Sequence, residues 1–427
     1  MTKLLHHQAQ VANYFADFQC IGSACPDSCC SGWQVTVDKQ TFKKLKTVKD
    51  ESLSSAIKKN IQVSNLGSSS AYAQIVLNEQ KTCPFLDTEL LCSVQKKVGA
   101  EYLSNTCRDY PRQYSAWGPQ TQLLGTLSCP ETARLCLLSQ EPWKFVEKST
   151  DIPLGKKIHH IAGVAGDLTR ANALHVRNYQ MLQDFAIKVM QHRDLEIWQR
   201  ILLVGLTCEK VDALAVENLE EAKADALLEQ LLLQAQLVML DGTFANQSQQ
   251  LNVNQNVRTA QLAFINRMTD ERLMLSTANN ELRINRAFLS CVEDAYRGLG
   301  FDVADLAASS QGLTDAQSAF IMFERIHPNI LENYFINSLV LEVFPMRKEM
   351  PLVEQWMNLI IRYAMVRFYL IGMKAFYKES FSPEHCVTLV YSFSKAVQHN
   401  SAFIPRIKEF LIQEKLNSLA TMAILIR

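Results

Sequence analysis

Eight of the twelve cysteines in this chain fall within its first 130 residues. They are Cys20, Cys25, Cys29, Cys30, Cys83, Cys92, Cys107 and Cys129. The first four form the pattern Cys-x4-Cys-x3-Cys-Cys, which packing alone does not explain, because a buried structural cysteine has no reason to recur at such short spacing. Thiolates gathered in this way usually hold a metal or are bonded to one another. The pattern therefore predicts a thiol site near the amino end of the chain.

Three kinds of thiol site compete, and the spacing separates them only in part. A disulfide framework needs an oxidising compartment, and residues 1–8 lack the apolar core of a secretory signal. Zinc usually takes two short Cys-x2-4-Cys knuckles; Cys25 and Cys29 fit one, but Cys83 and Cys92 are too far apart for a second. An iron–sulfur cluster also takes four thiolates, with looser spacing rules. Spacing alone leaves zinc and iron–sulfur equally open, with a smaller place for disulfides.

The adjacent pair Cys29 and Cys30 restricts the geometry of any such site. Neighbouring side chains point apart in an extended chain, so we expect one thiol to bind an ion while the other packs or serves a second site. The Cys-x3-Cys-x2-Cys motif of radical enzymes that cleave S-adenosylmethionine is absent, because Gly32 stands at its third position. The remaining cysteines are scattered through helical sequence and fit small core residues: Cys136, Cys208, Cys291 and Cys386.

The composition describes an ordinary globular protein of 427 residues, with 43 basic and 43 acidic side chains and a net charge of zero. A balanced charge gives no general field for nucleic acid, and no polybasic tract favours an anionic membrane. The most apolar C-terminal stretch, residues 359–373, is interrupted by Arg362 and Arg367 and does not read as membrane-spanning. We therefore expect a cytoplasmic protein with neither nucleic acid nor a membrane as partner.

The sequence pattern along the chain changes at about residue 140. Before it, residues 33–37 and 71–77 predict strands, residues 83–94 a hairpin, and residues 97–105 a short helix that ends before Cys107. After it, the apolar pattern is helical, most clearly over residues 179–189, 216–237, 329–344 and 354–377. The predicted fold is mainly α, with a small cysteine-rich α+β metal-binding domain (residues 1–140) fused to a larger all-α domain for substrate docking (residues 141–427).

The cysteine motifs, read in order, resemble those of the widespread CxxCxxCC cysteine-cluster family, which is thought to bind zinc or an iron–sulfur centre. The segments that carry this resemblance are residues 18–33, Cys83-Pro84-Phe85-Leu86, Cys92 and Cys107-Arg108-Asp109-Tyr110-Pro111-Arg112, about a third of the chain. The short members usually carry Tyr-x-x-Arg-Pro before the last motif. This chain has residues 96–102 (Lys-Lys-Val-Gly-Ala-Glu-Tyr) there, so a role for that arginine does not carry over.

Two further segments narrow the resemblance. Ser128-Cys129-Pro130-Glu131 and the helical stretch Glu332-Asn333-Tyr334-Phe335-Ile336-Asn337, followed by Phe344-Pro345, are similar to those of the flagellin lysine N-methylases, nearly over the full length. The resemblance implies methyl transfer from S-adenosylmethionine to surface lysines of flagellin. It also implies a [4Fe–4S] cluster, with zinc as the alternative, held among the eight cysteines.

Methyl transfer requires a cradle for a cationic sulfonium and a neutral attacking lysine. Near the thiols, the candidates for catalysis are Asp27, Asp109 and Tyr110, and those for cofactor binding are Trp33, Arg108 and Arg112; Tyr334 and Glu332 in the helical domain are weaker ones. The two arginines could bind a carboxylate or form salt bridges that close the small domain. The glycine pair at residues 163 and 166 lies in helical sequence and fits a loop better than a nucleotide-binding turn.

Two other functions use the same residues. A metal-stapled adaptor, with zinc or iron–sulfur, would present a helical surface to a partner and catalyse nothing. A redox or metal-handling protein would use the thiol site alone. The visible spectrum and a methylation assay distinguish these alternatives from the enzyme.

Overall fold

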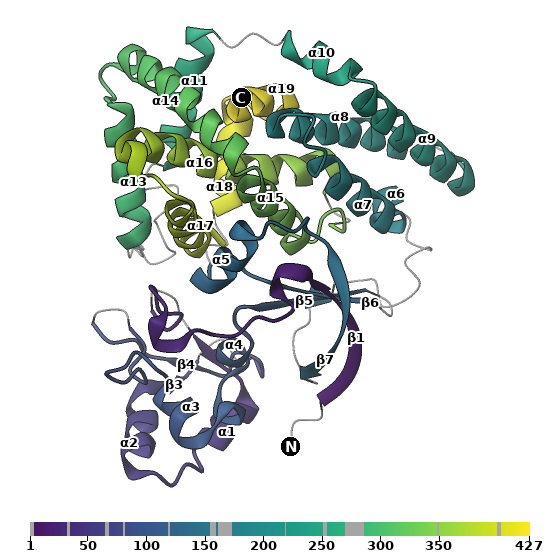
Figure 1. Ribbon diagram of the computed structural model, residues 1–427. Helices are drawn as coiled ribbons and strands as arrows, with labels where there is room; N and C mark the ends of the chain where they lie inside the picture. Colours follow the sequence, from purple (N-terminus) through teal and green to yellow (C-terminus); the bar gives the residue numbers. More distant parts are fainter. Residues whose placement is uncertain are drawn as a thin grey trace.

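The computed structural model describes residues 4–31, 35–64, 68–79, 82–117, 120–153, 159–160, 173–217, 219–250, 254–269, 286–347, 350–398 and 403–427. Most of this part is helical, with a small sheet region at the amino end (Figure 1), which confirms the predicted fold class in its coarse form.

The first half of the described chain carries all of the strands. Its strands are β1 Leu4–Ala12, β2 Thr36–Val37, β3 Ile61–Val63, β4 Ala73–Ile75, β5 Arg112–Trp117, β6 Gln120–Gly125, β7 Phe145–Pro153 and β8 His159–His160. Its helices are α1 Lys39–Leu45, α2 Glu51–Asn60, α3 Ser93–Val98, α4 Asn105–Asp109 and α5 Pro130–Leu138, with 3-10 turns η1 Asn13–Phe15, η2 Gly22–Ala24 and η3 Ala100–Tyr102.

The second half is built from helices. They are α6 Leu174–Arg177, α7 Tyr179–Met190, α8 Ile197–Val216, α9 Glu221–Leu240, α10 Thr243–Gln249, α11 Gln255–Thr269, α13 Arg286–Leu299, α14 Leu306–Ile326, α15 Asn329–Leu341, α16 Leu352–Tyr377, α17 Pro383–Gln398, α18 Phe403–Gln413 and α19 Leu419–Ile426, with the 3-10 turn η5 Lys378–Ser380 after α16.

Two sheets organise the amino-terminal half. The larger has the strand order β7-β1-β6-β5-β8, with β1 antiparallel to β7 from Leu4 opposite Pro153 to Ala12 opposite Phe145, and parallel to β6. The smaller has the order β2-β4-β3 and is antiparallel. Strand β7 lies beyond residue 140, so the prediction that everything after this residue is α-helical was wrong. Strand β7 is an edge strand of the larger sheet and pairs with β1. No local sequence pattern predicts that these two segments pair.

The described residues form two large hydrophobic cores and a small third cluster of Val176, Tyr179 and Met346. One lies within residues 35–103 and packs the small sheet against α1, α2 and the turns that carry several cysteines. The other joins the inner face of the larger sheet and α5 to the helices, from Ala9 to Ile426. These cores do not by themselves mark independent folding units, so the domain boundary at residue 140 stays a prediction.

Helix α16 is the centre of the helical half. Its side chains from Leu359 to Met373 are almost all buried, because α8, α13, α14, α15, α17 and α19 pack around it (Figure 1). A helix that is apolar on all sides is expected in such a central position. In the part of the chain that the structure describes, no helix is long and apolar enough to cross a bilayer.

The local predictions were accurate for three long helices and poor near the cysteines. The predicted stretch 216–237 is not one helix, because α8 ends at Val216 and α9 begins at Glu221. Helices α7, α15 and α16 match the predicted stretches, and β4 lies within residues 71–77. The helix predicted over residues 97–105 was wrong: α3 ends at Val98, because Gly99 adopts a φ of +97°, and Cys107 lies inside α4 rather than beyond a helix. The predicted hairpin is reduced to one antiparallel bridge between Leu86 and Cys92.

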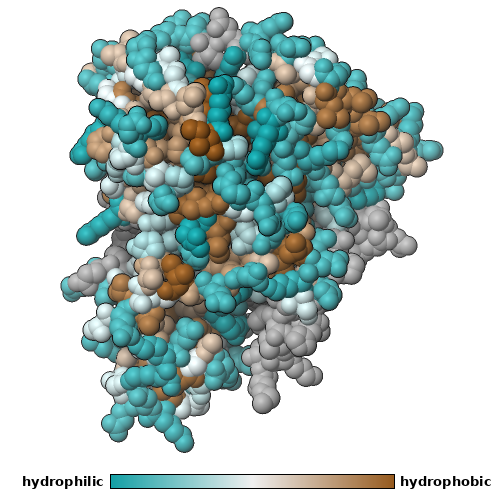
Figure 2. All heavy atoms as spheres, in the orientation of Figure 1, coloured by the Kyte–Doolittle hydropathy of each residue, from teal (hydrophilic) through white to brown (hydrophobic). Residues whose placement is uncertain are grey.

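Helix α9 leaves an apolar stripe exposed to solvent. Leu233, Leu237 and Leu240, spaced at helical intervals, are 57%, 55% and 63% exposed. Figure 2 shows brown side chains gathered over this helix at the upper right.

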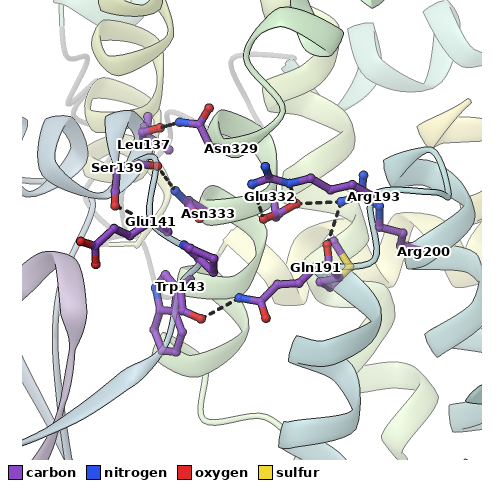
Figure 3. Close-up of polar contacts among 12 residues, drawn as sticks. Leu137, Ser139, Glu141, Trp143, Gln191, Arg193, Arg200, Asn329, Glu332 and Asn333 are labelled. Atoms are coloured by element: carbon purple, nitrogen blue, oxygen red, sulfur yellow. Dashed lines mark hydrogen bonds and ion pairs between the residues drawn. The ribbon is translucent and has the colours of Figure 1, made fainter.

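Asparagines on one face of α15 fasten α5 and the sheet to the helical half (Figure 3). Asn329 donates to the Leu137 carbonyl at 2.7 Å, and Asn333 to the carbonyls of Cys136 and Ser139 at 2.9 and 3.1 Å. The last carbonyls of a helix have no partner within it, so these side chains cap the end of α5. One turn on, Asn337 accepts a hydrogen bond from the Tyr14 hydroxyl and donates to the Gly125 carbonyl at 3.3 Å.

Glu332, on the neighbouring face of α15, is the buried anion of this region. It is 1% exposed and receives hydrogen bonds from Arg193 at 3.0 Å and from the buried Arg200 at 2.9 Å (Figure 3). Burial lowers the pKa of Arg200, while Glu332 acts to raise it. The pair therefore compensates two charges that would otherwise be desolvated alone.

We predict that Glu332→Ala destabilises the protein by about 3–5 kcal/mol, because it leaves the Arg200 guanidinium buried without a counter-charge. The midpoint of urea unfolding measures this. Arg193→Ala removes the more exposed partner, 43% accessible, and should cost about 1 kcal/mol or less. Equal losses of stability in the two variants would contradict our conclusion that the buried Arg200 needs Glu332 as its counter-charge.

Candidate thiol site

A tightly turned loop presents the first four cysteines. Residues 22–24 form a 3-10 turn, and the Ser28 hydroxyl accepts a hydrogen bond from the Cys30 amide at 3.1 Å. The amide of Cys83 then donates to the Cys30 carbonyl at 2.8 Å, next to a bridge between Ser31 and Thr82. These backbone contacts bring the early cysteine pairs against the segment that carries Cys83.

The later cysteines stand at the ends of short elements. Cys92 is the residue before α3, Cys107 lies in α4 behind the N-cap Ser104, and Cys129 precedes Pro130 at the start of α5. Short helices and turns leave side chains at their ends free to converge from several directions. The positions of these thiols therefore depend on the packing of the small core.

Five of the thiols line one cavity of about 100 Å³. They belong to Cys29, Cys30, Cys83, Cys92 and Cys107, and Tyr110 completes the polar side of the wall. Apolar side chains of the small core, including Val35, Ile75 and Phe85, form most of the rest, and the other polar lining residues are Gln95, Tyr102 and Ser104. A soft donor set in an apolar surrounding is the chemistry that zinc or an iron–sulfur cluster requires.

The adjacent thiols of Cys29 and Cys30 do not point apart as the sequence predicted. Residues 29 and 30 lie in a turn, and their sulfur atoms are 4.0 Å apart. The hydrogen bond between them raises the pKa of Cys29 above its ordinary value, and the bond from Cys30 lowers that of Cys83. Burial raises the pKa of Cys107 to about 11.

The other three early thiols lie beside this cavity. Burial, with the neighbouring Cys129, Cys20 and Cys29, raises the pKa of Cys25 to about 11. Its thiol donates to the Asp27 carbonyl at 3.0 Å, and this hydrogen bond acts in the opposite direction. These influences place Cys20, Cys25 and Cys129 within electrostatic reach of one another. All eight predicted cysteines thus gather in one region of the molecule.

The structure bears differently on the three kinds of thiol site, which are disulfides, zinc and an iron–sulfur cluster. All twelve cysteines lie in the described part of the chain and are present as thiols, so they do not form the disulfide framework. Among the described residues, no group of three or more histidine, cysteine, aspartate or glutamate side chains is arranged to hold a metal ion as it stands. The donor types fit a thiolate-bound metal, whereas the ligand set and the identity of the metal stay predictions.

A lysine from the helical half reaches into the thiol loop. Lys395 of α17 forms an ion pair with Asp27 at 2.9 Å and donates to the Ser28 carbonyl at 2.9 Å. Both side chains are largely buried, at 11% and 20% exposure. Sequence reasoning missed Lys395, because the two partners are 368 residues apart and α17 carries no motif. Asp27 is therefore engaged in positioning the loop.

The remaining predicted residues near the thiols have defined contacts. Arg108 pairs with Asp109 at 3.5 Å and donates to Asn105, so its ion pair stays within α4 and does not close the small domain. The Arg112 guanidinium lies over the Phe18 ring at 5.4 Å. The Tyr110 hydroxyl lies 3.1 Å from that of Ser128, and burial raises its pKa.

Three predictions fall outside the described residues or away from the thiols. Trp33 and the glycine pair at 163 and 166 lie outside the described residues. Tyr334 is 3% exposed in the core of the helical half, where burial raises its pKa. It lines a small pocket with Ser338 and Arg362 and does not contribute to the described wall of the thiol cavity.

Comparison with known proteins identifies the helical half. Residues 183–425 match the family model described as the FliB lysine N-methylase C-terminal domain, more than half of the chain. The chain belongs to the FliB lysine N-methylase family. The matched range includes Glu332 and Lys395 but none of the eight early cysteines.

Individual relatives agree with this assignment. The chain is 35% identical to the flagellar biosynthetic protein FliU of Salmonella muenchen over 138 residues, 32% of this chain and 81% of the relative. It is 28% identical to the lysine-N-methylase of Salmonella choleraesuis over 51% of this chain and 29% identical to that of Salmonella typhimurium over 50%. The match spans about half the length of these two enzymes, 52% and 51%. No solved structure matches the chain.

We predict that Lys395→Met loosens the thiol loop, because it leaves Asp27 partly buried without its counter-charge. Amide hydrogen exchange of residues 25–31 should become faster, while the exchange of α16 stays unchanged. In a double-mutant cycle, Asp27→Asn with Lys395→Met should lose less stability than the sum of the single changes. The control is Lys408→Met, which breaks a more exposed pair with Glu354 and should be nearly neutral. Unchanged exchange of residues 25–31 in Lys395→Met would refute this role.

Proposed function

We propose that this protein is a lysine N-methyltransferase that uses S-adenosylmethionine to methylate surface lysines of flagellin. The match of residues 183–425 to the lysine N-methylase family carries the proposal. The name of the FliU relative associates that protein with flagellar biosynthesis, which supports flagellin as the substrate.

The proposal includes a [4Fe–4S] cluster held among the early cysteines. The five thiols that line the cavity are the first candidates for its ligands, and Cys20, Cys25 and Cys129 are the reserve set. When bound, such a cluster would supply a structural staple or a redox-active centre beside the reaction. Zinc is the alternative metal for the same donors.

The residues of this chain have definite tasks in such a reaction. The attacking lysine must be neutral, and the apolar wall of the thiol cavity offers a surrounding that lowers the pKa of an amine by desolvation. Tyr110, at this wall, can accept or donate a hydrogen bond through its hydroxyl, which is already oriented by Ser128. Lys395 and Asp27 hold the loop in place. Methyl transfer then needs the two reactants in line at about 3 Å.

The positions of S-adenosylmethionine and of flagellin remain part of the proposal. Arg108, Arg112, Trp33 and Tyr334 are retained as candidates for cofactor binding, and Asp109 as a candidate for catalysis. The helical half is proposed as the docking surface for flagellin, because a protein substrate needs a wide face. We place the reaction in the cytoplasm.

The central experiment compares two buried cysteines. Cys83 lines the thiol cavity and is 7% exposed, whereas Cys208 packs in α8 and is 3% exposed. We predict that Cys83→Ala loses metal and lowers flagellin methylation about 10-fold or more, while Cys208→Ala keeps both within about twofold, because only the first removes a ligand donor. Iron content and absorbance measure the metal, and the mass of flagellin after incubation with S-adenosylmethionine measures the product.

The other outcomes identify which part fails. Full methylation by a metal-free protein would remove the cluster from the proposal. A protein that holds zinc and methylates flagellin would replace the iron. A protein that holds metal but does not methylate flagellin would favour the adaptor or redox alternative.

A further inference from the structure

A second cavity, of about 840 Å³, lies among the helical elements and is separate from the thiol site. Its described lining residues come from α8 and the turn before it, from α10, α11, α14 and α16, from α15 and the turn before it, and from the residue after α19. They include none of the eight cysteines. Its volume is within the range of about 300–1,000 Å³ that is usual for small-molecule sites. The proposed methyl transfer uses no residue of this cavity.

The wall of this cavity is strongly cationic. Three acidic side chains lie in it, Asp194, Glu196 and Glu324. Six arginines also line it: Arg193, Arg200, Arg258, Arg325, Arg367 and Arg427. The chain has equal numbers of acidic and basic side chains overall. Positive charge is therefore concentrated at the wall of this cavity.

Carboxylates compensate four of these arginines. Arg367 pairs with Glu324 at 3.2 Å, and Arg325 lies 3.9 Å from Glu196. Arg193 and Arg200 share Glu332, which lies behind the wall (Figure 3). Carboxylates of the protein therefore already act as counter-charges for these four arginines.

Arg258 and Arg427 differ from the other four. In the described part of the chain neither has a carboxylate partner. Arg258 is partly buried, and its guanidinium donates to the neutral Gln261 side chain at 3.0 Å. The Arg427 guanidinium lies 4.8 Å from the centre of the Trp198 ring, and its buried Nη1 atom has no hydrogen-bond partner. A buried donor without a partner, as at Arg427, is costly. Arg427 and the uncompensated Arg258 are therefore where a ligand is most strongly expected.

The mutual repulsion of these cations also supports a ligand at Arg258 and Arg427. Burial, together with the positive charges of Arg367 and Arg427, lowers the pKa of Arg258 to about 10. Three guanidinium groups thus approach one another closely enough to interact. An anion bound among them would reverse this unfavourable interaction.

We propose that this cavity binds a small molecule with two or more anionic groups, phosphate or carboxylate, through Arg258 and Arg427. The planar guanidinium presents paired N–H donors that match the oxygens of either group. The cavity volume favours a small molecule over a flat contact with a protein surface. The inference holds whether or not the protein methylates flagellin.

Isothermal titration of the full chain with pyrophosphate and with citrate, at ionic strength matched with sodium chloride, tests this proposal. We expect one or both to bind, and we expect Arg258→Gln and Arg427→Gln each to weaken binding about 10-fold or more through the lost charge-assisted hydrogen bonds. The control is Arg297→Gln, which changes an exposed arginine on α13 that pairs with Glu293 and should bind like the parent. The thermal midpoint in chloride alone verifies that each variant is folded.

Each outcome has a defined meaning. Binding of pyrophosphate that both cavity variants weaken identifies a phosphate ligand, and the same result with citrate identifies a carboxylate ligand. Absence of binding by both probes, or binding that Arg258→Gln and Arg427→Gln leave unchanged, overturns the proposal.

Discussion

The asparagine face of α15 is the constraint on which the rest of the molecule depends. Asn329, Asn333 and Asn337 are one turn apart and cap carbonyls of α5 and of the strand end at Gly125. Those carbonyls are buried, so without the amide donors the carbonyls of α5 would lose their hydrogen bonds to water with no replacement. The Gly125 carbonyl also accepts a hydrogen bond from the Tyr14 hydroxyl at 3.2 Å. Since α5 begins directly after Cys129 and the sheet leads into the thiol region, this polar joint fixes where the cysteines stand relative to the helical half.

Few long helices or strands stabilise the thiol region. Its cysteines occupy turns and the ends of short helices, and the small core beneath them is separate from the larger one. Such a region gains order from specific contacts rather than from extended packing. The backbone bond from Cys83 to Cys30 and the bridge from Lys395 to Asp27 are two such contacts, and the second is the one that comes from the helical half. A bound metal would add a further constraint of the same kind.

The two cavities of the molecule differ in their physical character. The thiol cavity is small and apolar, with soft sulfur donors, and suits a metal centre beside a desolvated amine. The arginine-lined cavity is large and cationic, and suits an anionic small molecule. Their described lining residues do not overlap.

The sequence by itself determined the long helices, the concentration of thiols and the family resemblance. Helical periodicity is a local property, so α7, α15 and α16 were predictable, and eight cysteines in 130 residues indicate a thiol site wherever they fold. Only the tertiary structure decided the partners across long separations. The pairing of β1 with β7, the bridge from Lys395 to Asp27 and the convergence of Arg258 with Arg427 each depend on packing between distant segments, for which the sequence carries no period or motif. The turn that brings the Cys29 and Cys30 sulfurs together also arises from its neighbours, which explains why an extended chain was the wrong reference.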